Sequence, residues 1–511
     1  MLKSLSLATA IALAPCLAVG PAVFAETPEG AAASLDAFLN EFPDLGPGYA
    51  VVVVTADDVL MRRVMGERRA VSGAPMTTDT PIYIASQTKA YMGLLAARLD
   101  AEGILPLDSA ISDYWPDLVL PEGVTAADWT LRDLITHQVP IENGAVTMLE
   151  AYVGHVDPAD YPRLIEAYSS PRDPGFRYDN LGYNIYGAIL ETATGRSWQD
   201  WLDLYVFEPL EMDRTSARTS DFPINELSWG HHWMGEEIGW FEIRPKTDGM
   251  MQSAGGLVTS VDDMATWLQL QLRGEGPGGS GITAAMVEAA QTGYVETHQE
   301  DRRNAAELPC SQYALGWNIC DFDGHDFYVH GGGYTGIRTQ MAFSPDLGVG
   351  IAAFSNSDNM TGWLTSRTIN MYFQFLTESE TAERMRQIRI EQYPQRIERY
   401  LDARLEQRNA VMDEPRWGGW SWSPSADELA DYAGRWTNGE PYFDVELRPV
   451  GPALIFNWGD MSGNMVPAVT DVFAGQASPF EDVQEFRFER DESGAVVRMI
   501  WTGTGTFTRA E

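Results

Sequence analysis

The apolar positions at the start of the chain predict a helix followed by a strand hairpin. Residues 31–42 have helical periodicity. Residues 48–55 and 59–64 are two apolar, β-branched runs, and the short acidic segment 56–58 between them is typical of a turn. We therefore expect a hairpin at the beginning of the folded part of the chain.

A second helix is predicted directly after a short extended segment. Residues 80–85 favour a strand or an extended lead-in, and residues 87–101 are rich in alanine and leucine. Gly103 follows at the position where a glycine commonly ends a helix. This pattern places Ser86 at a helix N-terminus.

The middle of the chain changes from a helical to a strand-like pattern. Residues 105–240 contain mostly helical segments and loops. Strand-like runs return at residues 315–318, 327–330 and 340–354. The pattern predicts a helical region inserted between parts of one sheet.

The last third of the chain is expected to form two helices, a linker and a small β domain. Residues 363–377 and 381–410 have helical patterns, and the segment 413–427, with its glycines and prolines, is typical of a linker. Beyond it, short segments of alternating polarity predict a small all-β barrel or sandwich. These segments are residues 443–447, 453–457, 485–489 and 496–501.

Composition narrows the class of protein. The 511 residues are 44% hydrophobic and 21% charged, which is typical of a globular chain with more than one core. There are 73 acidic and 35 basic residues, and a formal charge of -38 repels phosphate backbones, so nucleic acid is not an expected partner. After the first 25 residues no apolar stretch approaches the roughly 20 residues of a membrane span.

The first 25 residues have the three parts of an export signal. Lys3 gives a positive start, residues 5–17 an apolar core, and residues 23–25 a small-x-small cleavage site before Glu26. We expect cleavage after Ala25 and a secreted or periplasmic protein.

An oxidising compartment affects the interpretation of Cys310 and Cys320, which have nine residues between them. Two such cysteines more often form a disulfide than bind a metal. The alternative is a zinc site completed by His325 and His330, but zinc-binding cysteines usually lie two to four residues apart. We expect a disulfide and no metal.

Two lysines beyond the export signal, Lys89 and Lys246, stand out in a chain that otherwise uses arginine. Arginine does not release its proton at working pH, whereas a shielded lysine can take part in proton transfer. Lys89 follows Ser86 by three residues, which places both side chains on one helix face. Ser86 is therefore a candidate nucleophile with an adjacent amine.

Two further segments supply residues that an acyl-transfer site needs. Tyr178 can act as a general base if a nearby cation lowers its pKa from about 10, and the Asn180 amide can hold a substrate carbonyl. His330 ends a strand-like run and precedes Gly331-Gly332-Gly333, where glycines let a substrate lie against the backbone. An exposed N–H group there could pair with that of Ser86 to hold an oxyanion.

These three motifs resemble those of the penicillin-recognising serine hydrolases, most closely the class C β-lactamase and esterase branch. They are Ser86-Gln87-Thr88-Lys89, Tyr178-Asp179-Asn180 and His330-Gly331-Gly332, in the family's order. The resemblance covers roughly residues 31–375 and includes Leu131-Arg132-Asp133-Leu134 and Ala254-Gly255-Gly256-Leu257. The tail around residues 432–436 is similar to the lipocalin-like barrels of some members.

The resemblance implies an α+β fold, with a β-lactamase/transpeptidase-like sheet flanked by helices, an inserted helical region and a small all-β C-terminal barrel. The expected division is a signal peptide at 1–25, a catalytic domain at 26–378, a helical segment and linker at 379–426, and a lipocalin-like barrel at 427–511.

The resemblance also implies the site residues. Ser86 would attack a carbonyl, with Lys89 and Tyr178 moving its proton, and no cofactor would be needed. Substrate-binding roles fall to Asn180, His330, Gly332 and Gly333. His330 stands where β-lactamases carry lysine, which favours the family's esterases and D-amino-acid peptidases, because a histidine is a poorer permanent partner for a carboxylate.

The leading hypothesis is a secreted serine hydrolase that acts on small esters or amides. The nearest alternatives are a D-amino-acid or peptidoglycan peptidase and a β-lactamase. A different class is a non-catalytic protein whose C-terminal barrel holds an apolar ligand or a partner. The sequence does not indicate an oligomeric state.

Overall fold

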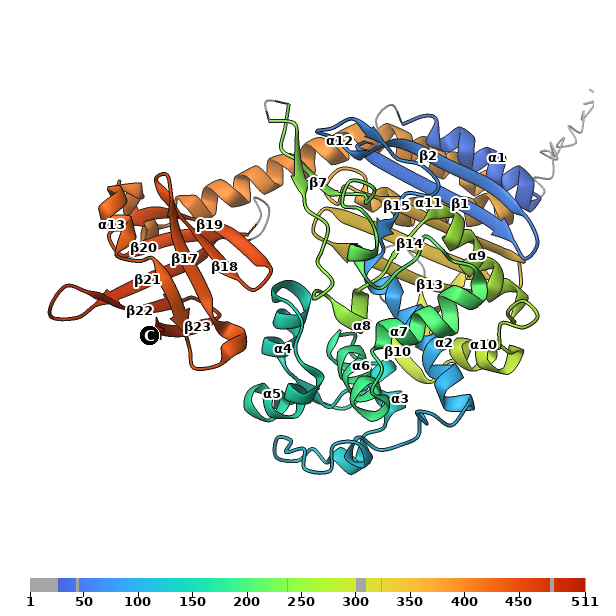
Figure 1. Cartoon of the computed structure of the whole chain (residues 1–511). Coiled ribbons are helices and arrows are strands. Elements are labelled where there is room, and N and C mark those ends of the chain that lie inside the picture. The colour runs from blue at the N-terminus through green and yellow to red at the C-terminus, as the bar shows by residue number, and fades with distance from the viewer. Residues whose placement is uncertain are drawn as a thin grey trace, which may run out of the picture.

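The computed structural model describes residues 26–42, 46–236, 238–299, 309–322, 324–477 and 482–510. Figure 1 shows a large body of helices around a sheet, a smaller barrel, and the helix α12 (Ser379–Met412) that runs from one toward the other. The predicted signal peptide lies outside the described residues. No helix in the described part of the chain has the length and apolar character that a membrane crossing requires.

The large body is built on an antiparallel sheet that joins two distant parts of the chain. Its nine described strands lie in the order β10 (Val295–Gln299), β11 (Cys310–Tyr313), β12 (Asn318–Phe322), β13 (His325–Tyr334), β14 (Ile337–Ser344), β15 (Val349–Ser355), β1 (Gly48–Thr55), β2 (Val59–Arg69) and β3 (Ala74–Pro75). The hairpin of β1 and β2 has the predicted location, and β1 also pairs with β15 along its whole length. The predicted α+β class is therefore confirmed.

The sheet is covered by helices on both faces. Tyr49, Val51 and Val53 of β1 are buried in one cluster with α1 (Pro28–Leu39) and α11 (Gly362–Thr377), while the alternate residues of β1 belong to the cluster on the other face. This two-sided burial explains why β1 is an unbroken apolar run. The other long helices of this body are α2 (Thr88–Ala101), α6 (Leu181–Thr194) and α9 (Val261–Arg273).

The inserted helical region lies between β3 and β10. It also contains α3 (Leu131–Ile135), α4 (Gly144–Met148), α5 (Tyr161–Tyr168), α7 (Trp198–Leu202), α8 (Gln252–Gly255), α10 (Ala284–Gln291) and several short helical turns. Three strand pairs accompany these helices: β4 (Ile82–Tyr83) with β9 (Val258–Thr259), β5 (Ile141–Glu142) with β6 (Ser170–Pro171), and β7 (Gly230–Trp233) with β8 (Trp240–Ile243). The insertion inferred from the helical pattern is present.

One predicted strand is wrong in its position. Residues 315–317 form the turn between β11 and β12, closed by a hydrogen bond from the Ala314 N–H to the Trp317 carbonyl. Gly316 has φ +87°, and a Cβ there would lie 2.2 Å from the Lys89 carbonyl oxygen. The turn is thus pressed against α2 at Lys89, which requires a glycine and excludes an extended strand.

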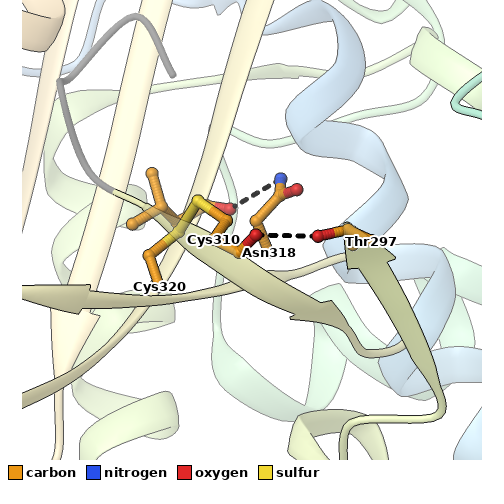
Figure 2. The surroundings of a disulfide bond; sticks show 5 residues. Thr297, Cys310, Asn318 and Cys320 are labelled. Carbon is orange, nitrogen blue, oxygen red and sulfur yellow. Dashed lines mark hydrogen bonds between the residues drawn. A yellow bond between two sulfur atoms is a disulfide. The ribbon is translucent and has the colours of Figure 1, made fainter. Parts of the chain in front are cut away.

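The predicted disulfide pair lies on neighbouring strands at one end of the sheet. Cys310 of β11 is opposite Cys320 of β12, and their sulfur atoms are bonded to each other. Figure 2 shows the disulfide beside Thr297, whose hydroxyl donates to the Cys310 carbonyl at 2.8 Å. These sulfurs are therefore not zinc ligands, and the described residues contain no cluster of three or more metal-binding side chains.

The C-terminal part is a closed antiparallel barrel. Its strands are β16 (Gly434–Thr437), β17 (Val445–Val450), β18 (Ala453–Trp458), β19 (Met461–Val469), β20 (Val472–Gln476), β21 (Gln484–Arg490), β22 (Val496–Trp501) and β23 (Gly505–Arg509). Large side chains of the barrel are buried against one another: Phe486 lies 4.5 Å and Trp458 5.2 Å, centroid to centroid, from Trp501. The barrel interior therefore contains its own aromatic core.

The segment predicted as a linker packs on the barrel. It contains a short helical turn at Pro415–Trp420 and the helix α13 (Ala426–Ala430). Trp417 is fully buried in a cluster with Ala468 and Val472. Gly418 and Gly419 have φ of +54° and +68° in this segment, so both its glycines and the buried Trp417 contribute to its conformation.

The barrel also contacts the inserted helices. Tyr442 accepts a hydrogen bond from the Asp157 N–H at 3.0 Å and donates to Asp160 at 2.8 Å, and Arg163 pairs with Glu440. The backbone N–H of Asp460, between β18 and β19, donates to a carbonyl of the inserted region at 2.6 Å. The barrel is thus held against the part of the large body that borders the candidate site.

Candidate active site

Ser86 lies on a strained turn at the start of α2. The turn Ala85–Gln87 is a single 3-10 turn, and Ala85 has φ +47°, a left-handed conformation that a residue with a side chain rarely adopts. Such strain persists where surrounding structure enforces it and is common at functional sites. Ser86 lines a cavity of about 560 Å³, so its side chain is accessible.

Lys89 lies beneath Ser86 with every proton of its ammonium group engaged. Its Nζ donates to Ser86 Oγ at 3.3 Å, to Asn180 Oδ1 at 2.8 Å and to the Ala254 carbonyl at 2.7 Å. The residue is fully buried. An amine that has lost one proton can keep the two shorter bonds and direct its lone pair at Ser86.

Burial brings the pKa of Lys89 close to neutral pH. Desolvation lowers the pKa of this amine from 10.5 to about 7, and the nearby Asp179 carboxylate raises it in part. A general base is most effective when its pKa lies near the working pH. The lysine identified from its spacing to Ser86 is therefore able to act as a base at neutral pH.

Tyr178 lines the cavity beside Ser86, and its pKa is shifted in the opposite direction from the one expected. Its hydroxyl is hydrogen-bonded to Ser86, and its ring lies 5.0 Å from the Lys89 Nζ. Burial of the hydroxyl raises the pKa of Tyr178 above its ordinary value of 10.0, whereas we expected a nearby cation to lower it. The shift is opposite in direction to the expected one, and Tyr178 is a neutral phenol that can pass a proton.

A salt bridge and a histidine hold the loop that carries Tyr178. Arg172 pairs with Asp179 at 2.7 Å, and the Asp179 N–H donates to His137 Nδ1 at 3.3 Å. The His137 ring lies 4.4 Å from the Tyr178 ring, and burial lowers the pKa of His137 well below 6.5. His137 is thus a neutral support for this loop.

His330 occupies a different position from the one expected of a substrate-binding residue. It is 2% exposed, does not line the cavity, and its ring contacts the Gly331 carbonyl at 2.8 Å and the Tyr313 hydroxyl at 3.4 Å. Burial and the charge of Lys89 lower the pKa of His330 to about 3. His330 is therefore neutral, and its ring contacts its own strand β13 and Tyr313 of β11.

The two glycines predicted to bind substrate have different environments. Gly333 lines the cavity. Gly332 does not line it, but a Cβ at Gly332 would lie 2.0 Å from the Ile84 carbonyl oxygen. Gly332 therefore allows β13 to approach the turn that carries Ser86, a role in packing instead of direct substrate contact.

The structure brings the predicted residues together and adds a wall that the sequence analysis missed. Ser86, Tyr178, Asn180 and Gly333 share the cavity lining with side chains from the inserted region and β13. The added wall includes Met148, Ala151, Tyr152, Met251 and Tyr334. No motif marks these wall residues, whereas the Ala254 carbonyl that holds Lys89 belongs to Ala254-Gly255-Gly256-Leu257, a segment on which the family resemblance rests.

A nucleophilic serine beside a buried amine, an amide and a glycine-lined strand defines the class of serine hydrolases with a Ser-x-x-Lys site. The family model described as Beta-lactamase matches residues 35–368. The chain therefore belongs to the β-lactamase family, and it carries an additional C-terminal barrel.

Curated relatives include penicillin-binding proteins and hydrolases. An unguisins hydrolase of Aspergillus campestris is 24% identical over 327 residues, covering 61% of this chain and 58% of the relative. Penicillin-binding protein 4 of Amycolatopsis lactamdurans is 26% identical over 333 residues, covering 62% of this chain and 83% of the relative. The match thus spans less than two thirds of the unguisins hydrolase.

Solved structures share the fold at low identity. The octameric penicillin-binding protein homologue from Pyrococcus abyssi has a TM-score of 0.57 at 19% identity and covers 93% of this chain and 100% of its own. The D-amino acid amidase from Ochrobactrum anthropi has a TM-score of 0.56 at 18% identity, and the hydrolase EstCE1 one of 0.55 at 18%. Each of the latter two covers 68% of this chain and 99% of its own.

Proposed function

We propose that this protein hydrolyses small ester or amide substrates through an acyl-enzyme on Ser86. The observation that carries the proposal is the fully buried Lys89 amine, 3.3 Å from Ser86 Oγ at the edge of an open cavity. Its pKa of about 7 leaves a substantial neutral fraction at physiological pH.

In the first step Ser86 Oγ attacks the substrate carbonyl carbon and its proton passes to neutral Lys89. The negative charge that develops on the carbonyl oxygen is held by the backbone N–H groups of Ser86 and Gly333, the arrangement implied by the family resemblance. The hydrogen-bonded Tyr178 phenol then carries a proton from Lys89 to the departing alcohol or amine. The acyl group remains on Ser86.

In the second step water cleaves the acyl-enzyme. A water molecule loses a proton through Tyr178 to Lys89 as its oxygen attacks the acyl carbon, and Ser86 regains its proton as the acid leaves. Asn180 keeps the amine in place through its 2.8 Å contact with Nζ, and its amide faces the cavity where the acyl side chain would lie.

The environment of His330 favours ester or amide substrates over β-lactams. A β-lactam carries a carboxylate next to its reacting ring, and a neutral buried histidine offers that carboxylate no charge. The solved relatives include a D-amino acid amidase and a hydrolase, EstCE1, which supports the same substrate classes. A D-amino-acid peptidase remains the alternative within this enzyme class.

The non-catalytic alternative has less support. The aromatic side chains of the barrel, such as Phe486 and Trp501, are buried and pack against each other in its interior. Ser86, Lys89 and Tyr178 are all in place for chemistry.

The test is intact-mass spectrometry after exposure to a fluorophosphonate probe and, separately, to a penicillin. We expect a fluorophosphonate adduct on the wild type that is absent from Ser86→Ala, and no stable penicilloyl adduct. A penicilloyl mass would move the assignment to peptidoglycan substrates. A wild-type protein that takes up neither label would contradict a hydrolase.

We also propose that the protein is exported, with cleavage after Ala25. The Cys310–Cys320 disulfide supports an oxidising compartment. Expression of the full chain in a bacterial host, followed by N-terminal sequencing of the extracytoplasmic fraction, should give Glu26 as the first residue. A mature protein that begins at Met1 in the cytoplasm would contradict this.

A further inference from the structure

A second cavity adjoins the catalytic one at the boundary with the barrel. Its volume is about 810 Å³, and it shares Tyr152 and Tyr334 with the lining of the cavity that contains Ser86. These two rings are stacked with centroids 5.7 Å apart. The two cavities therefore border the same aromatic pair.

The walls of the second cavity come from both parts of the protein and combine apolar with polar side chains. The charged groups in this lining are Glu242, which pairs with Arg69, and Arg244, Lys246, Asp248 and Asp460. The large body contributes Phe222, Ile224, Leu227, Ile243 and Met250, and the barrel contributes Met461. Asp460 of the barrel accepts a hydrogen bond from the Thr247 hydroxyl at the edge of this cavity. The barrel hairpin between β18 and β19 thus completes a pocket that the large body begins.

Lys246 is a buried cation in this lining. It is 5% exposed, and its Nζ donates to the carbonyl of the adjacent Thr247 at 3.1 Å and lies 5.8 Å from the Tyr83 ring. Burial lowers the pKa of Lys246 from 10.5 to about 8, so the amine is still mostly protonated at neutral pH. A buried charge is costly unless an opposite charge compensates it.

The nearest carboxylate is already engaged by other donors. Asp248 raises the pKa of Lys246 in part, while the Lys246 Nζ donates its hydrogen bond to the Thr247 carbonyl. The Asp248 oxygens accept from the Thr219 hydroxyl at 2.9 Å and from the Ser220 N–H at 3.1 Å and hydroxyl. Lys246 therefore retains donor capacity for a group that enters the cavity.

We propose that the second cavity binds an apolar arm of the substrate that ends in a carboxylate, and that Lys246 is the cation that receives it. The proposal rests on the proposed hydrolysis at Ser86 and names the substrate class of that site. A single ammonium group matches a single carboxylate, while the apolar walls match the chain between the carboxylate and the bond that is cleaved. The substrate is thus an ester or amide of a dicarboxylic acid or a compound of similar shape.

Two esters test this preference because they differ only in the end of the acyl chain. They are mono-para-nitrophenyl hexanedioate, which ends in a carboxylate, and para-nitrophenyl hexanoate, which ends in a methyl group. We expect the wild type to have a kcat/KM for the carboxylate ester about tenfold above that for the neutral one. In Lys246→Met, which removes the charge and keeps a similar length, we expect this ratio to fall about tenfold.

Arg244→Met is the matched control. Arg244 lines the same cavity but is exposed, so its charge is screened by water, and its removal should leave the ratio within about twofold of the wild type. Thermal unfolding of both variants checks that each is folded. An equal ratio in the wild type and Lys246→Met, or an equal fall in both variants, would overturn the proposal.

A binding experiment separates this inference from the hydrolysis itself. Calorimetric titration of Ser86→Ala with hexanedioate requires no turnover, and we expect saturable binding that weakens about tenfold in the Ser86→Ala/Lys246→Met double variant. Binding of hexanedioate without fluorophosphonate labelling of the wild type would contradict the proposed hydrolysis but support the subsite. Labelling of the wild type without Lys246-dependent binding would support hydrolysis and reject the subsite.

Discussion

The Lys89 amine lies 3.3 Å from the Ser86 hydroxyl and is held there by two stronger contacts, to the Asn180 side chain and the Ala254 carbonyl. Since both of these partners are acceptors, the proton that is released on deprotonation is the one directed at Ser86. Helix geometry alone brings the two residues near each other, but the acceptors from α8 and from the loop before α6 give the amine its orientation.

Replacement of Lys89 by methionine or arginine should lower kcat by about a thousandfold on para-nitrophenyl acetate, because neither side chain can accept the Ser86 proton. Arginine keeps the charge, so an equal loss in both variants would show that proton transfer matters more than charge. The control is Arg62→Met, which removes an exposed cation paired with Asp262. Wild-type activity in Lys89→Arg would contradict the role of the amine as a base.

The acid side of the pH profile should report the titration of Lys89. The protonated amine cannot accept a proton, so kcat/KM should rise about tenfold per pH unit below pH 7 and level off above it. His137 and His330 contact this region, but burial lowers the pKa of His137 well below 6.5 and that of His330 to about 3. Initial rates between pH 5 and 9 test this, and a profile that is flat or falls across that range would contradict it.

Asp179→Asn should move this profile to lower pH. Desolvation lowers the pKa of Lys89, and the Asp179 carboxylate partly offsets this by raising it. Without the carboxylate, the pKa of Lys89 should fall further. The same change leaves Arg172 buried without its ion pair, which costs about 3 kcal/mol of stability. The comparison variant is Glu142→Gln, which breaks an exposed pair with Arg177 in the same wall. An acid limb that stays in place or moves to higher pH would argue against Lys89 as the titrating group.

Gly332→Ala and Gly331→Ala are adjacent substitutions with opposite expectations. A Cβ at Gly332 would lie 2.0 Å from the Ile84 carbonyl, so β13 must move away from the turn that carries Ser86. A Cβ at Gly331 would meet the end of the Gln340 side chain at 2.8 Å, and that side chain can rotate. Fluorophosphonate labelling should slow about a hundredfold or more in the first variant and change little in the second. Equal labelling rates would show that the close approach at Gly332 is not needed.

Much of the fold is local enough to be predicted from periodicity. The hairpin of β1 and β2, the helix after Ser86 and the late β domain each depend on neighbouring residues. The pairing of β1 with β15 joins residues about 300 positions apart. The pattern of helices and strands predicted that distant parts of the chain share one sheet, but it did not identify which strands pair. The turn at 315–317 was assigned to a strand because its apolar residues are buried against α2, which periodicity cannot distinguish from burial in a sheet.

In the candidate site, too, features set by neighbouring residues could be predicted from the sequence, and features set by distant segments could not. Ser86 and Lys89 follow from helical spacing, whereas the ionisation of Tyr178 and His330 depends on burial by segments distant in sequence. The wall residues Tyr152 and Tyr334 carry no motif, because an aromatic side chain at a cavity looks the same in sequence as one in a core.

Glu150→Gln should stabilise the protein at neutral pH. Glu150 is fully buried, accepts hydrogen bonds from the Tyr161 hydroxyl at 2.7 Å and the Val156 N–H at 3.1 Å, and has its pKa raised from 4.5 to about 8 by burial. The folded protein therefore keeps a proton that the unfolded chain releases above pH 4.5, so stability falls as pH rises from 4.5 to 8. Glutamine imitates the neutral acid. At pH 7 it should add about 2 to 3 kcal/mol to the free energy of unfolding and remove this part of the pH dependence.

Urea unfolding at pH 5 and pH 7.5 measures the effect of Glu150→Gln, with Glu166→Gln on the exposed side of α5 as the control. A wild type with equal stability at both pH values would show that Glu150 is ionised in the folded protein.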